Sequence, residues 1–171
     1  MNTLIIILLN IVFVVPLLYW AMVYGVTESV SDIFRVMQKR HGRGSFRPWS
    51  FWLWLAMVGA LFFAYFLNGV AFLTMFGLVL LGAAAEYWKS KHVEIPHITG
   101  ALVGILGGYA TLIVHAIKAD HWLTGVWCLI AGVFGALLMD KYLKKNTTYW
   151  IEVIQFIMII VGITLIDFIY V

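Results

Sequence analysis

The sequence predicts an all-α fold: a polytopic transmembrane bundle of six helices, with both termini outside the cell and a short interfacial amphipathic helix in the first loop. Of the 171 residues, 64% are hydrophobic and only 11% are charged, and the hydrophobic residues fall into six stretches. Soluble domains average about 45 to 50% apolar and about 25% charged residues. A soluble chain could not cover so many apolar side chains with a polar surface, so lipid must surround most of this protein.

Each hydrophobic stretch has about the length that crosses a hydrocarbon core of roughly 30 Å. The first has no basic n-region and no small-residue cleavage motif, so we expect a retained helix and not a signal peptide. Asn68-Gly69 is a natural turn between the second and third stretches. No linker or repeat interrupts the pattern, which predicts a single domain over residues 1–171. The predicted spans are 3–24, 51–67, 70–87, 98–117, 122–139 and 150–169.

The distribution of lysine and arginine gives an independent test of this count. Loops one, three and five carry ten of the eleven basic residues, and loop four carries only Lys118. Short loops rich in lysine and arginine stay in the cytoplasm. The alternation therefore predicts cytoplasmic odd-numbered loops and both termini outside. We expect the protein to reside in the plasma (inner) membrane of the cell.

Loop one has a helical pattern of its own. Ser29-x-x-Asp32 resembles a capping box that can start a helix, and Gly42 can end it. Apolar residues recur on one side between these points, which predicts a short amphipathic helix in the membrane interface. We expect anionic lipids or a protein partner, and not nucleic acid, to contact the basic residues, because the run is short and juxtamembrane. These residues are Arg35, Lys39, Arg40, Arg43 and Arg47.

Small residues indicate how the spans pack. Gly100, Gly104 and Gly108 lie four apart on one face of the fourth span, which permits close approach of another helix. Packing within the bundle is the favoured interpretation, and a homo-oligomer through this face is the alternative. The single Cys128 excludes an intrachain disulfide, and no paired-histidine signature predicts a metal site or a cofactor.

Polar residues near the predicted cytoplasmic helix ends are the candidate ligand-binding groups, because polar side chains are costly in lipid. They are Asp32, Glu86, His97, Glu152 and Gln155. Glu152 lies about one turn inside the sixth span and needs a partner, for which His97, Arg35 and Lys39 are candidates. Such a cluster can do acid–base work, hold a metal or bind a polar headgroup. Helix caps and interfacial ion pairs are the alternative explanation.

On the outer side, snorkelling of each side chain to the interface is the simpler explanation of His115 and Asp167. Their meeting in a small external polar site is the alternative.

Four short motifs carry a resemblance to known proteins. Ser29-Val30-Ser31-Asp32 follows the first span, and Gly82-Ala83-Ala84-Ala85-Glu86 ends the tight second and third pair. His97-Ile98-Thr99-Gly100-Ala101 opens the fourth span and Trp150-Ile151-Glu152 opens the sixth. This layout resembles small six-span membrane proteins of Bacteroidetes and their phages. More distantly, it is similar to the damage-regulated autophagy modulators and the GPI-lipid-remodelling membrane proteins of eukaryotes. The resemblance implies six spans and singles out Asp32, His97 and Glu152.

These observations lead to three functional hypotheses. The first is a membrane protein whose cytoplasm-facing polar pocket binds a lipid headgroup or small amphiphile, as an enzyme or as a binding protein. The second is a channel, transporter or pore-type effector, against which the nearly charge-free middle of each span counts. The third is a membrane scaffold that recruits a partner through basic loop one.

Overall fold

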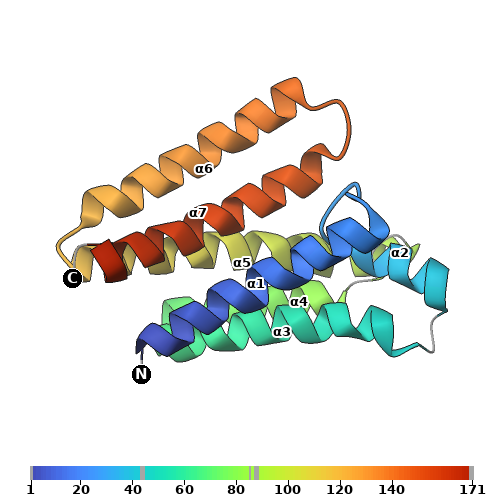
Figure 1. Cartoon of the computed structure of the whole chain (residues 1–171), viewed down its shortest axis with the longest axis horizontal. Helices are drawn as coiled ribbons and strands as arrows, with labels where there is room; N and C mark the ends of the chain where they lie inside the picture. Colours follow the sequence, from blue (N-terminus) through green and yellow to red (C-terminus); the bar gives the residue numbers. More distant parts are fainter. Residues whose placement is uncertain (1, 43–44, 85, 87–88, 170–171) are drawn as a thin grey trace.

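The computed structural model describes residues 2–42, 45–84, 86 and 89–169, and over these ranges the protein consists of helices and their connections, without strands. The helices run back and forth along one long axis, and α2 lies at one end of the bundle (Figure 1). They are α1 (Asn2–Tyr24), α2 (Asp32–His41), α3 (Phe46–Phe66), α4 (Gly69–Ala83), α5 (Lys91–Lys118), α6 (Trp122–Tyr142) and α7 (Thr147–Ile169).

Five of these helices, α1, α3, α5, α6 and α7, are long and apolar enough to cross a membrane. The protein is thus an all-helical, multi-pass membrane protein. The remaining apolar helix, α4, has 15 residues, and at a rise of 1.5 Å per residue it is about 22 Å long. It runs antiparallel to α3 and to α5, with Asn68 capping its start by accepting a hydrogen bond from the Ala71 N–H.

Three helices begin three or more residues earlier than hydropathy predicts, because each helix also includes polar residues that precede the apolar run. Helix α3 begins at Phe46 and not at residue 51, since the Ser45 hydroxyl accepts a hydrogen bond from the Arg47 N–H. Helix α5 begins seven residues before residue 98, and the Ser90 carbonyl accepts the first helical hydrogen bonds. Helix α7 begins at Thr147, three residues early.

The third predicted span is too long at its carboxyl end. Helix α4 ends at Ala83, and the Ala84 N–H closes its last turn on the Leu80 carbonyl. The predicted end, residue 87, lies outside the described residues. An apolar run therefore continues past the point at which the backbone leaves the helix.

Helix α2 forms where the loop-one pattern predicts it. The Ser29 hydroxyl accepts a hydrogen bond of 3.2 Å from the Asp32 N–H, and Gly42, with φ of 80°, ends the helix. Its apolar side chains, Ile33, Phe34 and Met37, are buried in the protein core. The apolar side of α2 therefore packs on the bundle, while Lys39 and Arg40 on its other side are exposed.

Glycines bring α4 and α5 into close contact. A Cβ atom on Gly100 would come within 2.5 Å of the Leu81 backbone nitrogen, and one on Gly77 would collide with the backbone of Gly104. A Cβ atom on Gly108 would come within 2.7 Å of Ile159 in α7. The glycine face of α5 is thus occupied within the chain, and it fixes the start of α5 beside the end of α4.

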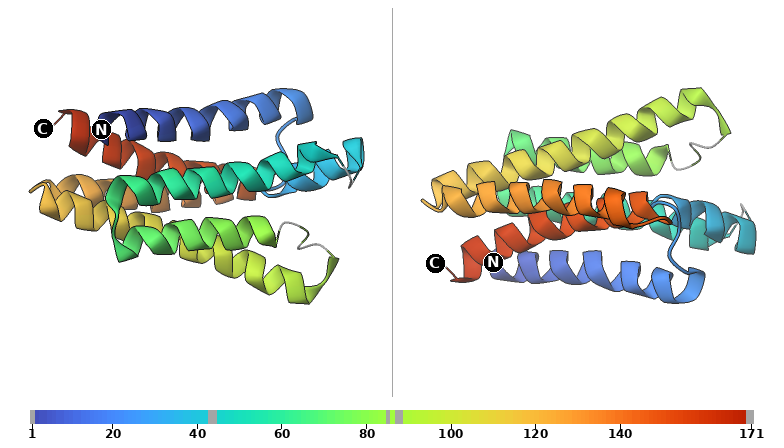
Figure 2. Two further views of the ribbon diagram at one scale, coloured as in Figure 1. Left: turned by 90° about the horizontal axis from the view of Figure 1, so that it is seen from below. Right: turned by 90° about the horizontal axis from the view of Figure 1, so that it is seen from above.

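The connections at the two ends of the bundle differ in their content of basic residues. The α1–α3, α4–α5 and α6–α7 connections lie at the end that carries α2, here called the α2 end, and α1 begins and α7 ends at the opposite end (Figure 2). All described lysines and arginines except Lys118 therefore belong to the α2 end. This is the arrangement that the alternating charge pattern requires.

Candidate functional site at the α2 end

A hollow of about 350 Å³ opens at the α2 end between loop one, α5 and α7. Its titratable lining comes from three distant segments, and we call it the acidic hollow after these residues: Glu28, Asp32, Glu94, His97 and Glu152. The structure thus brings Asp32, His97 and Glu152, the three residues that the motifs single out, to one site. Apolar side chains of α5, Ile98 and Leu102, complete one wall and are about half exposed.

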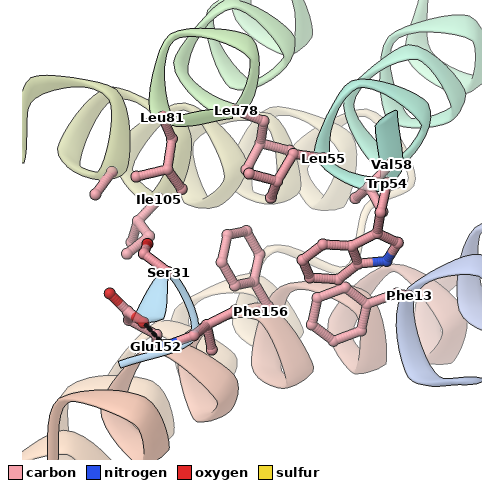
Figure 3. A pocket seen from close by; sticks show the side chains of 12 residues that line it. Phe13, Ser31, Trp54, Leu55, Val58, Leu78, Leu81, Ile105, Glu152 and Phe156 are labelled. Atoms are coloured by element: carbon pink, nitrogen blue, oxygen red, sulfur yellow. Dashed lines mark hydrogen bonds between the residues drawn. The ribbon is translucent and has the colours of Figure 1, made fainter. Parts of the chain in front are cut away.

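Glu152 is held by the backbone of loop one. The Val30 N–H donates a hydrogen bond of 2.7 Å to Glu152 Oε2, shown by the dashed line in Figure 3. Nearby, the Tyr149 N–H donates to the Glu28 carbonyl at 2.9 Å. The sequence did not predict this backbone partner of Glu152, and a contact of Glu152 with His97, Arg35 or Lys39 stays a prediction. A buried backbone N–H needs an acceptor, and the Glu152 carboxylate provides one for Val30, just before α2 begins.

His97 is buried, with 7% of its surface exposed. Its Nδ1 atom lies 3.1 Å from the Ala84 carbonyl oxygen, so Nδ1 carries the proton and donates it. In the neutral ring this leaves Nε2 with the lone pair. The contact joins the end of α4 to the first turns of α5, which fixes His97 in the wall of the acidic hollow.

Behind the acidic hollow lies a small inner cavity of about 20 Å³, enough for one water molecule. Glu152 lines both spaces. Apolar side chains from α1, α3, α4, α5 and α7 form the other walls of the inner cavity, and Ser31 lies beside Glu152 at one end (Figure 3). Ser31 is 1% exposed, and its hydroxyl has no hydrogen-bond partner among the described residues.

Two predicted site residues lie elsewhere. Gln155, one turn deeper in α7, accepts a hydrogen bond from the Tyr109 hydroxyl at 2.8 Å and donates to the Gly132 carbonyl at 2.9 Å. It therefore links α5, α6 and α7 in the bundle interior. Glu86 accepts a hydrogen bond of 2.6 Å from Gln38, forms an ion pair with Lys89, and lines a separate hollow.

The residues of the site that were not predicted to bind a ligand include Glu28, Glu94 and Ser31. Glu94 lies one helical turn before His97 on α5, and this spacing is a signal that could have found it. Ser31 carries no such signal, because its importance comes from being buried without a partner.

The basic residues of loop one partly fold back on the protein. Arg35 forms an ion pair of 3.8 Å with Asp32, and Arg40 donates to the Val23 carbonyl at 3.1 Å. Desolvation and the positive charges of Arg47 and Arg40 lower the pKa of His41. Lys39 is exposed, and Arg43 lies outside the described residues.

His115 and Asp167 meet at the opposite end, which is the explanation that the sequence favoured less than snorkelling. His115 Nε2 lies 2.8 Å from Asp167 Oδ1, and the Tyr65 hydroxyl donates to the other carboxylate oxygen. This cluster joins α3, α5 and α7.

No protein-family model, no curated protein and no solved structure matches this chain. The site is therefore interpreted from its own chemistry. Among the described residues, no three histidine, cysteine or acidic side chains are grouped closely enough to hold a metal ion. What the acidic hollow offers is a set of hydrogen-bond acceptors with negative charge, next to an apolar wall.

Proposed function

We propose that this protein binds a lipid headgroup or another small amphiphile in the acidic hollow. The observation that carries the proposal is that Asp32, His97 and Glu152, from three separate segments, line one hollow. Exposed Ile98 and Leu102 on α5 support it, because they give the same hollow an apolar wall facing outward. A polar recess beside an apolar surface matches the two halves of an amphiphile.

The topology of the proposal has six crossings, with α4 as the short third one, the α2 end in the cytoplasm and both termini outside. Helix α2 then lies at the cytoplasmic interface of the plasma (inner) membrane, where Lys39, Arg43 and Arg47 attract anionic lipids. The charge at the α2 end supports this orientation. A reporter that is active only in the cytoplasm can be fused to either terminus. Activity of such a fusion would contradict the proposed orientation.

Two observations favour binding over conduction through the bundle. The space behind the acidic hollow holds about 20 Å³, which is room for one water and not for a file of ions. The glycine face of α5, the path that a channel would use, is closed by α4. A homo-oligomer remains a proposal that requires another surface, because Gly100 and Gly104 face α4 and Gly108 faces α7.

Extraction and mass spectrometry of the amphiphiles that co-purify with the protein test the proposal. Wild type is compared with Glu152→Gln and His97→Gln, and with Asp140→Asn as a control, because Asp140 is an exposed carboxylate of the α2 end that does not line the hollow. We expect an amphiphile enriched over the bulk membrane extract with wild type and the control, and depleted at least severalfold with the two hollow variants. The same extract from all four proteins would overturn the proposal. Chemical conversion of the bound molecule in the same extract would identify an enzyme.

A further inference from the structure

We infer that the head of the ligand is a primary ammonium group, of the kind carried by phosphatidylethanolamine or a long-chain amine. This inference rests on the proposed function and deepens it, because it names the charge and the hydrogen-bonding chemistry of the ligand.

The charge of the lining is the first step. Four carboxylates and one imidazole line the acidic hollow, and no lysine or arginine does so among the described residues. Ionised carboxylates only accept hydrogen bonds. An anionic head would be repelled by them, whereas a cation would offset the cost of holding Glu152 in the wall of the bundle.

The second step distinguishes a primary from a quaternary ammonium group. Glu152 uses Oε2 to accept from Val30, and the Ser31 hydroxyl beside it is buried without a partner. Figure 3 places both polar groups at the same end of the inner cavity. A primary ammonium group in the acidic hollow has N–H donors for Glu152, which lines both spaces, and for Ser31 through the one water that the inner cavity can hold. A quaternary ammonium group has no N–H to donate.

The surroundings fit the rest of such a ligand. The exposed Ile98 and Leu102 offer an outward-facing surface for an apolar chain. Arg35 and Lys39 line an adjoining hollow that shares Glu28 and Asp32 with the acidic hollow. Positive charge therefore lies next to the carboxylates, where the phosphate of a zwitterionic headgroup would follow its ammonium group.

Native mass spectrometry of the full-length protein in detergent micelles tests the inference. The probes are phosphatidylethanolamine, phosphatidylcholine and phosphatidylglycerol with identical acyl chains, which carry a primary ammonium, a quaternary ammonium and no cation, respectively. We expect phosphatidylethanolamine to bind about tenfold or more tightly than phosphatidylglycerol, the effect of one charge-assisted hydrogen bond. Glu152→Gln should reduce this preference severalfold and Asp140→Asn should leave it unchanged. Because Glu152 also holds loop one, Glu94→Gln, at an exposed position of the same hollow, provides a second variant.

Ser31→Ala separates the hydrogen bond from the charge. It should narrow the preference for phosphatidylethanolamine over phosphatidylcholine while keeping the preference of both over phosphatidylglycerol. Dodecylamine, added as a competitor, distinguishes the two sources of the ammonium group. If dodecylamine binds more tightly than phosphatidylethanolamine, the ligand is a free amine; if it binds more weakly, the ligand is a lipid.

One outcome would overturn the ammonium inference but not the proposed function: wild type binds phosphatidylglycerol or phosphatidylcholine as tightly as phosphatidylethanolamine, and substitution of Glu152 abolishes that binding. A second outcome would overturn both: all three lipids bind equally, and no substitution in the acidic hollow changes their binding.

Discussion

The backbone N–H of Val30 donates a hydrogen bond of 2.7 Å to the carboxylate of Glu152, which lies 122 residues later in the chain. Together with the bond from the Tyr149 N–H to the Glu28 carbonyl, it fastens loop one to the first turns of α7. Glu152 is therefore both a wall of the acidic hollow and part of what holds that wall in place.

Glu152→Ala should destabilise the fold more than Glu152→Gln does. The alanine variant leaves the Val30 N–H without its acceptor, whereas a glutamine side chain still offers an oxygen to it. A hydrogen bond to a charged group contributes about 1.5 to 3 kcal/mol, so we expect a loss in this range for alanine and a smaller one for glutamine. Reversible unfolding in mixed micelles measures both, and equal losses would contradict this role of the carboxylate.

Gly100→Ala should separate α4 from α5. The added Cβ would lie 2.5 Å from the backbone nitrogen of Leu81, and a backbone atom cannot rotate away as a side chain can. Overpacking of this kind costs about 1 to 3 kcal/mol. Gly69→Ala is the matched control, because nothing lies within 4 Å of a Cβ at that position. Unfolding of the two variants in micelles measures the difference, and equal stability would show that the α4–α5 contact tolerates expansion.

Asp167→Ala should destabilise the end of the bundle opposite α2. It removes the acceptor for both Tyr65 and His115, each of which would then be partly buried without its partner. Unsatisfied partners of this kind cost about 1 to 3 kcal/mol each. Tyr65→Phe removes one donor and leaves the His115 contact, so its loss should be smaller. A thermal melt of the two variants measures the order, and a larger loss for Tyr65→Phe would contradict it.

His41 should titrate below its ordinary pKa of 6.5. Desolvation and the charges of Arg47 and Arg40 disfavour its protonated form, so the ring should remain neutral as pH falls through 6.5. Replacing Arg47 with alanine should raise the midpoint toward 6.5. Histidine ring signals followed by NMR in micelles report both midpoints, and a wild-type midpoint above 6.5 would contradict the assignment.

Sequence patterns predict those features of this fold that depend on local composition. Hydropathy identifies the helices because a segment surrounded by lipid must be apolar. It misses their first residues, Phe46, Lys91 and Thr147, because polar residues occur in the first turns. It also overestimates the length of α4, because Ala84, although apolar, already lies outside the helix. Helix ends depend on capping contacts, which an average over a window does not represent.

The acidic hollow could be predicted only in part. Asp32, His97 and Glu152 all lie in the first two turns of helices that begin at the same end of the bundle, so topology alone brings them near one another. The depth of a side chain and its partners come from packing, however. Gln155 shares a face with Glu152 but lies one turn deeper, where the Gly132 carbonyl and the Tyr109 hydroxyl engage it. Ser31 matters because its buried hydroxyl has no hydrogen-bond partner among the described residues, and no sequence pattern predicts that.

In the proposed topology, in which α4 is one of six crossings, its shortness has a consequence for the bilayer itself. A helix of 15 residues is about 8 Å shorter than a hydrocarbon core of roughly 30 Å. Hydrophobic mismatch of this size is relieved by local thinning of the membrane. Since α4 ends beside His97, through the contact of that ring with the Ala84 carbonyl, we expect the thinned region to lie next to the acidic hollow. Lipid headgroups would then be drawn inward to the depth of the hollow, and a lipid could enter it from the side without leaving the membrane.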